Sequence, residues 1–313
     1  MTSGRTPTDV VESGVRGLFR VALPDGSVRL AAGDTRGGPT DLIGPDRTIA
    51  DILRAGRGGL SDAVAGPTAG PVPTGAKILA PLDAQEVWAA GVTYRRSHEA
   101  RVEEASEPSV YDKVYVADRP ELFFKSTAAR VRATAEAIGI RSDSSWDVPE
   151  PELILVVTPS LEIAGYALGD DVSSRSIEGD NALYLPQAKF YRWSCAIGPA
   201  LVPADAVELP LDISLTVRRG ADVAFAGSTS TAALRRSPDE LVAWLGRALD
   251  FPDGALLMTG TGIVPDASFT LQPGDDVEID GGPLGILRNP VDRVEVRPVN
   301  APLEASGPAG PRR

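Results

Sequence analysis

Short runs of apolar and β-branched residues, separated by glycine and proline, dominate the second half of the chain. Residues 153–157 form such a run, which is too short for a typical helix and typical of a buried strand. A second run at 163–168 can pair beside it across a turn near 158–160. Further strands are expected at 213–217, 223–226, 255–259, 276–279 and 294–296. The pattern predicts a mainly β domain, closer to a rolled sheet than to alternating strands and helices.

The N-terminal part of the chain shows a different pattern. Two apolar runs, 17–23 and 27–31, flank an Asp-Gly pair, which predicts a hairpin. Residues 48–55 predict a short amphipathic helix, and the glycine- and proline-rich stretch 56–75 is interpreted as a joint. Further strands are expected at 77–80 and 86–90.

These patterns predict three parts. Residues 1–75 form a small N-terminal α+β domain with its linker, and residues 76–300 form the main domain. Residues 301–313, rich in proline, glycine and alanine, are expected to be a flexible tail.

Two helices are expected in the main domain. Alternating charges at 94–105 predict an exposed helix. Residues 239–249 predict a second helix, with Ser237 as its cap and Pro238 in its first position. Glu240 is expected to complete a capping box with Ser237.

Composition narrows the cellular setting. No window approaches the ~20 apolar residues of a membrane span. The single cysteine, Cys195, excludes an internal disulfide framework and fits a reducing cytoplasm. Its neighbours, 193–198, favour a buried strand over a nucleophilic site. We therefore expect a cytoplasmic protein without a membrane partner.

The net charge of −12 argues against nucleic acid as a partner, because phosphate contacts need basic patches. An anionic substrate would need a local cation. Most basic residues are arginines, and the lysines are few: Lys77, Lys113, Lys125 and Lys189. A lysine inside a site carries weight because, unlike arginine, it can lower its pKa when buried and transfer a proton.

Three carboxylates stand out beside the two paired runs. Glu150 and Glu152 enter the first run two residues apart, so in an extended chain both face one side. Asp171 follows the second run. Three carboxylates without a soft ligand suit a hard cation such as Mg²⁺, with Mn²⁺ or Ca²⁺ as alternatives. A Glu-x-Glu pair is also common on solvated surfaces, but Pro149 and Pro151 stiffen this one.

Six segments in order resemble the fumarylacetoacetate hydrolase family. They are 91–94, 119–125, 149–153, 165–175, 197–199 and 258–261, and the resemblance covers roughly residues 80 to 300. It implies an α+β, mainly β fold: a mixed β-roll catalytic domain, often preceded by a small N-terminal domain. It also implies a dimer or a dimer of dimers, so a homo-oligomer is expected.

The resemblance places the metal ligands on Glu150, Glu152 and Asp171, with Mg²⁺ as the usual ion. Asp170 stands where the family often has asparagine, which adds a negative charge near the site.

One branch of the family is closer. Segments 91–97, 111–115 and 177–189 resemble the 2-keto-3-deoxy-pentonate dehydratases. The resemblance implies a small-molecule 2-oxo acid substrate, such as 2-keto-3-deoxy-D-arabinonate. The reaction gives 2,5-dioxopentanoate and water through a metal-stabilised enolate.

Proton transfer in this reaction requires a base and an acid on the substrate side of the metal. Lys189 has the spacing of the family's active-site lysine, and Glu121 is the best remaining carboxylate. We expect these two to form the proton-transfer pair, without deciding which is the base. Glu121 could instead be a structural partner of Arg119, and Lys189 could be an anchor for the substrate carboxylate.

Four supporting contacts are predicted: Arg175, Thr261, Ser97 and Tyr94. Arg175 matches a family substrate-side arginine, but it could pair with Glu178 or a metal-site glutamate instead. Lys125 could support either the pocket or the core edge.

One departure separates the chain from the family's carbon–carbon hydrolases. Ser97 occupies the place of their catalytic histidine, and Ala100 occupies the place of its partner glutamate. His98 is one residue later, which on a helix rotates a side chain by about 100°. This favours a dehydratase, which needs no attacking water.

Three alternatives remain open. An acylpyruvate or fumarylpyruvate hydrolase would place His98 beside the metal with Glu103 or Glu99 as its partner. A 2-oxo acid tautomerase or decarboxylase would use the same metal without elimination. A non-catalytic metal-binding protein would not need Glu121 and Lys189.

Overall fold

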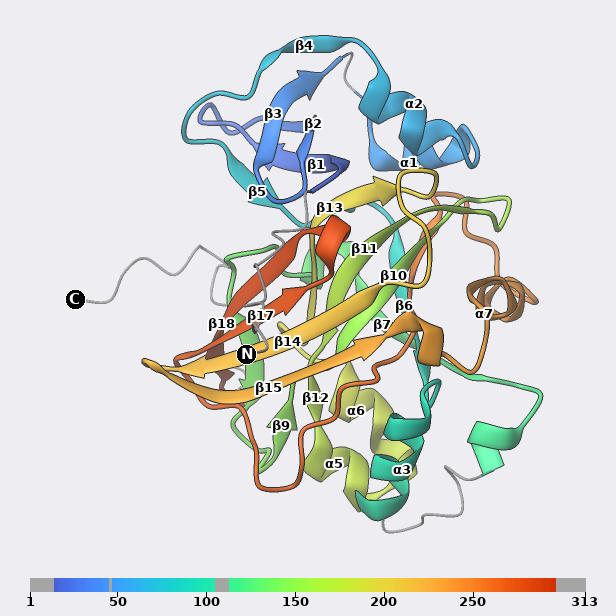
Figure 1. Cartoon of the computed structure of the whole chain (residues 1–313), viewed down its shortest axis with the longest axis vertical. Coiled ribbons are helices and arrows are strands. Elements are labelled where there is room, and N and C mark those ends of the chain that lie inside the picture. Colours follow the sequence, from blue (N-terminus) through green and yellow to red (C-terminus); the bar gives the residue numbers. More distant parts are fainter. Residues whose placement is uncertain (1–13, 45–46, 105–112, 297–313) are drawn as a thin grey trace, which may run out of the picture.

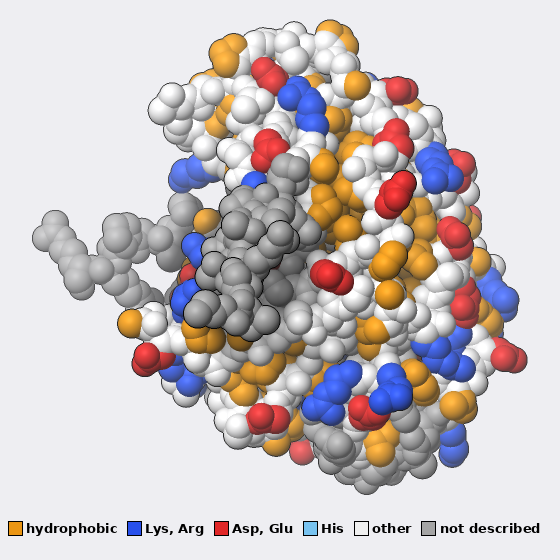
Figure 2. Space-filling view, in the orientation of Figure 1, with side chains coloured by type: hydrophobic (Ala, Val, Ile, Leu, Met, Phe, Trp, Pro, Cys, Tyr) orange, Lys and Arg blue, Asp and Glu red, His pale blue; other side chains and the backbone are white. Residues whose placement is uncertain are grey.

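The computed structural model describes residues 14–44, 47–104 and 113–296 (Figure 1). The predicted tail, 301–313, lies outside these residues. Within them, no helix is both long and apolar enough to cross a membrane. Acidic and basic side chains are interspersed over the face drawn in Figure 2, so the net charge is not gathered in one patch there.

The described residues form a large sheet of eleven strands. Its order is β4-β3-β2-β1-β13-β11-β10-β16-β6-β7, with β5 paired to β1. These strands are β1 (Arg16–Ala22), β2 (Val28–Asp34), β3 (Gly38–Ile43), β4 (Thr68–Pro71), β5 (Lys77–Leu79), β6 (Glu86–Gly91), β7 (Glu121–Thr127), β10 (Pro151–Val157), β11 (Ile163–Asp171), β13 (Cys195–Pro203) and β16 (Ala255–Met258).

A five-stranded sheet has the order β15-β14-β17-β18-β8, and β12 pairs with β9 in a short ribbon. These strands are β8 (Ile138–Arg141), β9 (Asp147–Val148), β12 (Ser173–Ser174), β14 (Asp212–Arg219), β15 (Asp222–Ser230), β17 (Asp275–Asp280) and β18 (Ile286–Val294). The mainly β fold predicted from the sequence is thereby confirmed.

The helices cover the ends and sides of the sheets. They are α1 (Ile49–Arg54), α2 (Gly59–Ala65), α3 (Arg95–Glu104), α5 (Arg175–Asp180), α6 (Leu185–Lys189) and α7 (Pro238–Leu245), with short 3-10 turns η1 (Ala128–Arg130), η2 (Ala182–Tyr184), η3 (Thr231–Ala233) and η4 (Gly282–Leu284). Figure 1 places α3, α5 and α6 together at the end of the molecule opposite α1 and α2. The helix predicted over 94–105 is confirmed as α3.

Both faces of β10 are buried, which explains its unbroken apolar sequence. Leu153, Leu155 and Val157 pack into the core shared with the five-stranded sheet and α7. Ile154 and Val156 point the other way, into the core beneath α1 and α2. β10 therefore forms a rigid base for the carboxylates at its start.

The N-terminal hairpin is confirmed as β1 and β2, in register from Arg16↔Asp34 to Ala22↔Val28. The predicted helix is confirmed as α1, whose cap Thr48 exchanges hydrogen bonds with Asp51.

The prediction that residues 56–75 form a joint is wrong about their structure, because that stretch contains α2 and β4. Leu60, Ala63 and Val64 recur at helical spacing and are buried, a pattern that the surrounding glycines and prolines conceal. β4 pairs with β3, and β1 meets β13 at Leu18↔Leu201.

One strand near the C-terminus differs from the prediction. The strand predicted over 294–296 is instead β18, which ends at Val294. Pro290 argues against a strand in sequence, but it occupies an exposed position in the alternating pattern of β18.

The helix predicted over 239–249 is α7, which ends earlier, at Leu245. Ser237 accepts from the Glu240 amide at 3.1 Å, as predicted. The Glu240 carboxylate contacts Arg236 Nη1 at 2.6 Å, so it does not return a bond to the cap.

Candidate active site

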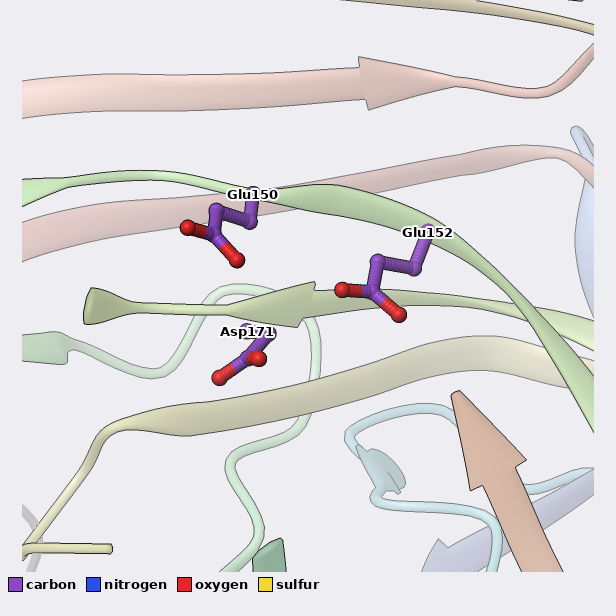
Figure 3. A group of neighbouring side chains, drawn as sticks. All are labelled: Glu150, Glu152 and Asp171. Carbon is purple, nitrogen blue, oxygen red and sulfur yellow. The ribbon is translucent and has the colours of Figure 1, made fainter. Parts of the chain in front are cut away.

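Three buried carboxylates converge where the β10–β11 hairpin opens (Figure 3). Glu150 precedes β10 and Glu152 is its second residue, and both side chains extend toward the same side. Asp171 ends β11, and its amide donates to the Glu150 carbonyl at 2.9 Å. One carboxylate oxygen from each residue lies within 4.8 Å of the others, and each residue is at most 3% exposed. We call these residues the carboxylate triad.

Lys189, the last residue of α6, crosses to two members of the triad. Its ammonium donates to Glu150 Oε2 at 2.5 Å, to Asp171 Oδ2 at 2.9 Å and to Ser173 Oγ at 2.6 Å. Three acceptors for three hydrogens are the arrangement expected of a protonated lysine.

A second buried lysine supports this arrangement from β7. Lys125 Nζ pairs with Asp171 Oδ1 at 2.5 Å and donates to the backbone carbonyls of Val172 and Lys189. Burial opposes ionisation of Asp171, but Lys125 and Lys189 outweigh it and hold the pKa of Asp171 below its usual range. Lys125 is fully buried, so it fixes Asp171 and the end of α6 without reaching the cavity described below.

Glu152 is the member of the triad whose negative charge is least balanced by neighbouring cations. Its Oε2 accepts from the Gly260 amide at 2.6 Å, and within the described residues no lysine or arginine forms an ion pair with it. Burial raises the pKa of Glu152 well above its usual range, and Asp171 and Glu150 raise it further. A divalent cation would offset this repulsion, and an all-oxygen donor set is what Mg²⁺ prefers. The residues therefore fit a hard metal ion.

The Gly260 amide is aimed by its own backbone geometry. Gly260 has a φ of 88°, and a Cβ there would lie 2.0 Å from Thr93 Oγ1. Thr93 Oγ1 donates to the Thr259 carbonyl at 2.6 Å. This close packing needs glycine and directs its N–H at Glu152.

Asp170 stands where the family often has asparagine, and its carboxylate binds the backbone of a triad residue. Its Oδ1 accepts from the Glu150 amide at 2.9 Å. Burial raises the pKa of Asp170 to about 7, although the bond from Glu150 lowers it in part. Asp170 thus helps to hold Glu150.

The triad forms one part of a cavity with about 350 Å³ of empty space. Its lining residues are Ala90, Gly91, Val92, Ser97, Glu121, Phe123, Glu150, Glu152, Asp171, Glu178, Leu185, Lys189, Gly260 and Thr261.

Glu121 reaches the cavity across the neighbouring strand. It starts β7 and pairs with Gly91 of β6. A Cβ on Gly91 would lie 2.1 Å from Glu121 Oε2, so the carboxylate occupies the space that the glycine leaves open.

Two of the four predicted supporting residues line the cavity, namely Ser97 and Thr261. Tyr94 is 2% exposed and does not line it; burial raises the pKa of Tyr94. Arg175 Nη2 pairs with Glu150 Oε1 at 2.8 Å and also lies outside the cavity lining. Arg175 therefore pairs with a metal-site glutamate, which was one of the alternatives open from the sequence. Its contact with substrate stays a prediction.

Sequence reasoning missed Glu178 as a cavity residue. It lies on α5, three residues after Arg175, and it is 4% exposed. Residues three apart share a face of a helix, so the spacing carried this signal. The Gly260 amide, by contrast, could not be found from side-chain patterns.

Cys195 lies opposite Asp171 in β13, as the strand prediction requires. It is 1% exposed, and burial raises its pKa to about 12. This thiol is not a nucleophile at neutral pH.

The hydrolase alternative depends on His98, which belongs to α3. The side chains of His98 and Glu103 lie outside the part that the structure describes. Glu99, the other proposed partner, pairs with Arg95 at 3.1 Å.

Comparison with known proteins identifies relatives over most of the chain. The fumarylacetoacetate hydrolase C-terminal family model matches residues 86–292. A probable 2-keto-3-deoxyxylonate dehydratase of Haloferax volcanii is 51% identical over 216 residues, 68% of this chain and 74% of its own. The 2-dehydro-3-deoxy-D-arabinonate dehydratase of Saccharolobus solfataricus is 43% identical over 223 residues, covering 69% and 75%.

A solved structure of 2-keto-3-deoxy-D-arabinonate dehydratase, complexed with magnesium and 2,5-dioxopentanoate, is also similar. It matches with a TM-score of 0.78 and 35% identity, over 90% of this chain and 100% of that one.

Proposed function

This chain belongs to the fumarylacetoacetate hydrolase family, and we propose that it is a magnesium-dependent dehydratase. It converts a 2-keto-3-deoxy-pentonate, such as 2-keto-3-deoxy-D-arabinonate, to 2,5-dioxopentanoate and water. The observation that carries this function is the single cavity in which the carboxylate triad, Glu121 and Lys189 meet. The dehydratases to which the chain is similar support it.

The triad would hold the metal ion, with Mn²⁺ or Ca²⁺ as alternatives to Mg²⁺. The bound ion supplies a Lewis acid that polarises the keto group of a 2-oxo acid and acidifies its C3 hydrogens. The Gly260 amide and Arg175 hold Glu152 and Glu150 in place for this task.

Glu121 and Lys189 form the proposed proton-transfer pair. Lys189 already donates to three oxygens, which favours a protonated cation in that position and Glu121 as the base. Glu121 takes a proton from C3, and the C4 hydroxyl then leaves. Lys189 offsets negative charge beside the substrate and supplies a proton to the departing hydroxyl.

Substrate binding is assigned to two residues of the cavity lining, with two more residues behind them in support. Ser97 and Thr261 supply hydroxyls to the cavity lining. Tyr94 acts one layer behind, since its carbonyl accepts from Ser97 Oγ at 2.8 Å. Arg175 adds positive charge behind Glu150 and favours an anionic substrate.

The test is a coupled assay of the purified protein with Mg²⁺ and each C4 stereoisomer of 2-keto-3-deoxy-pentonate. An added semialdehyde dehydrogenase reports 2,5-dioxopentanoate as NAD(P)H. Product formation with one isomer, abolished by EDTA and restored by Mg²⁺, is expected. Cleavage of acylpyruvates without dehydration would support the hydrolase instead.

We further propose a cytoplasmic homo-oligomer with a small N-terminal domain (1–75) and a catalytic domain (76–300). The family's usual dimers support the oligomer, and the single buried cysteine fits a reducing compartment. Analytical ultracentrifugation tests the oligomer, limited proteolysis tests the domain boundary, and cell fractionation tests the location.

A further inference from the structure

The chemistry of this dehydration makes a demand that Glu121 and Lys189 do not meet. Removal of a C3 proton and the C4 hydroxyl gives 5-hydroxy-2-oxopent-3-enoate, which still carries an alcohol at C5. To become its isomer 2,5-dioxopentanoate, this compound must lose one proton from C5 and one from the C5 hydroxyl, and gain one proton at C3 and one at C4. A second group that exchanges protons is therefore needed at the far end of the substrate.

Resting on the proposed function, we infer that Glu178 is this second group. It is the one cavity-lining carboxylate, within the described residues, that belongs neither to the triad nor to β7. It is 4% exposed, so its carboxylate is held inside the cavity wall.

The register of α5 aims Glu178 into the cavity. Arg175 starts this helix and pairs with Glu150 of the triad. Glu178 is three residues later, on the same face. Leu185 and Lys189 line the cavity from α6, which packs against α5. Glu121 enters from β7, so the two carboxylates act from different elements.

The proton balance then closes without any further reactant. Glu121 returns its proton to C3 while Glu178 takes a proton from C5, which yields the C4–C5 enol. Glu178 delivers that proton to C4 as the enol becomes the aldehyde. The proton released from the C5 hydroxyl restores Lys189, which gave a proton to the departing C4 hydroxyl. Each carboxylate ends in its starting state.

The test compares Glu178→Gln with the wild-type enzyme and with Asp180→Asn, an exposed carboxylate on the same helix that does not line the cavity. Proton NMR follows the unsaturated compound, the final product, and hydrogen exchange at C3 in D₂O. Circular dichroism and magnesium titration check that each variant folds and binds the metal.

We expect Glu178→Gln to keep C3 exchange, to release 5-hydroxy-2-oxopent-3-enoate, and to form 2,5-dioxopentanoate at least ~10²-fold more slowly. With substrate deuterated at C5, the wild-type enzyme should place part of the deuterium at C4. Wild-type product formation by Glu178→Gln would overturn the inference, as would equal loss of C3 exchange and product. If the wild-type enzyme forms no product from either isomer, the proposed function fails instead.

Discussion

Replacing Gly91 by alanine should move Glu121 without unfolding the protein. The new Cβ would lie 2.1 Å from Glu121 Oε2 and 2.6 Å from its Cδ, whereas ordinary contacts begin near 3.4 Å. The carboxylate must therefore move by about 1.3 Å. A displacement of this size in a catalytic group can lower kcat by ~10²-fold.

Stability should respond little to the same change. The clash involves the far end of a flexible side chain, and alanine in a strand gains about 0.5–1 kcal/mol over glycine in conformational entropy. We expect the free energy of unfolding of Gly91→Ala to stay within ~1 kcal/mol of wild type. Gly58→Ala, where no atom lies within 4 Å of the new Cβ, is the control.

The assay combines steady-state kinetics with thermal unfolding and a double-mutant cycle. If Gly91 acts through Glu121, then Gly91→Ala should add little to the loss caused by Glu121→Gln. Full activity in Gly91→Ala, or losses that multiply in the double mutant, would refute the proposed role of Glu121.

Three further predictions concern the surroundings of the site. Lys125→Met leaves Asp171 with one cation and should lower the free energy of unfolding by about 3–5 kcal/mol, measured by thermal unfolding. Lys77→Met, at an exposed position, is the control and should cost little, and a small loss for Lys125→Met would contradict the role of Lys125 in holding Asp171. Burial raises the pKa of Asp147 to about 6 in the folded state, so its protonation stabilises the fold at low pH and this contribution is lost as pH rises through 6. Asp147→Asn should therefore gain up to about 3 kcal/mol over wild type at pH 8 but little at pH 4, and an equal gain at both pH values in chemical denaturation would exclude this cause. Glu152→Gln keeps an acceptor for the Gly260 amide but loses its charge, so calorimetry should show magnesium affinity reduced by ~10²-fold or more; unchanged affinity would remove the triad as the metal site.

The sequence predicted the hairpin that builds the site because its signals are local. The apolar run of β10, the spacing of Glu150 and Glu152, and the turn before β11 all lie within a short segment. The convergence of Asp171 with the two glutamates follows from this pairing.

Other features depended on contacts between distant segments. The space that Gly91 leaves for Glu121, and the bonds of Lys125 to Asp171 and the end of α6, appear only when separate strands and helices meet. The structure of 56–75 was missed because glycines and prolines outnumber the few apolar residues that anchor α2.

The most direct test of the account is NMR of the purified enzyme acting on 2-keto-3-deoxy-pentonate, with EDTA and after Mg²⁺ is restored. We predict that one C4 stereoisomer is converted to 2,5-dioxopentanoate only when Mg²⁺ is present, and that Glu152→Gln abolishes the conversion. Conversion that continues undiminished in EDTA, or no conversion of either isomer with Mg²⁺, would contradict the central claim.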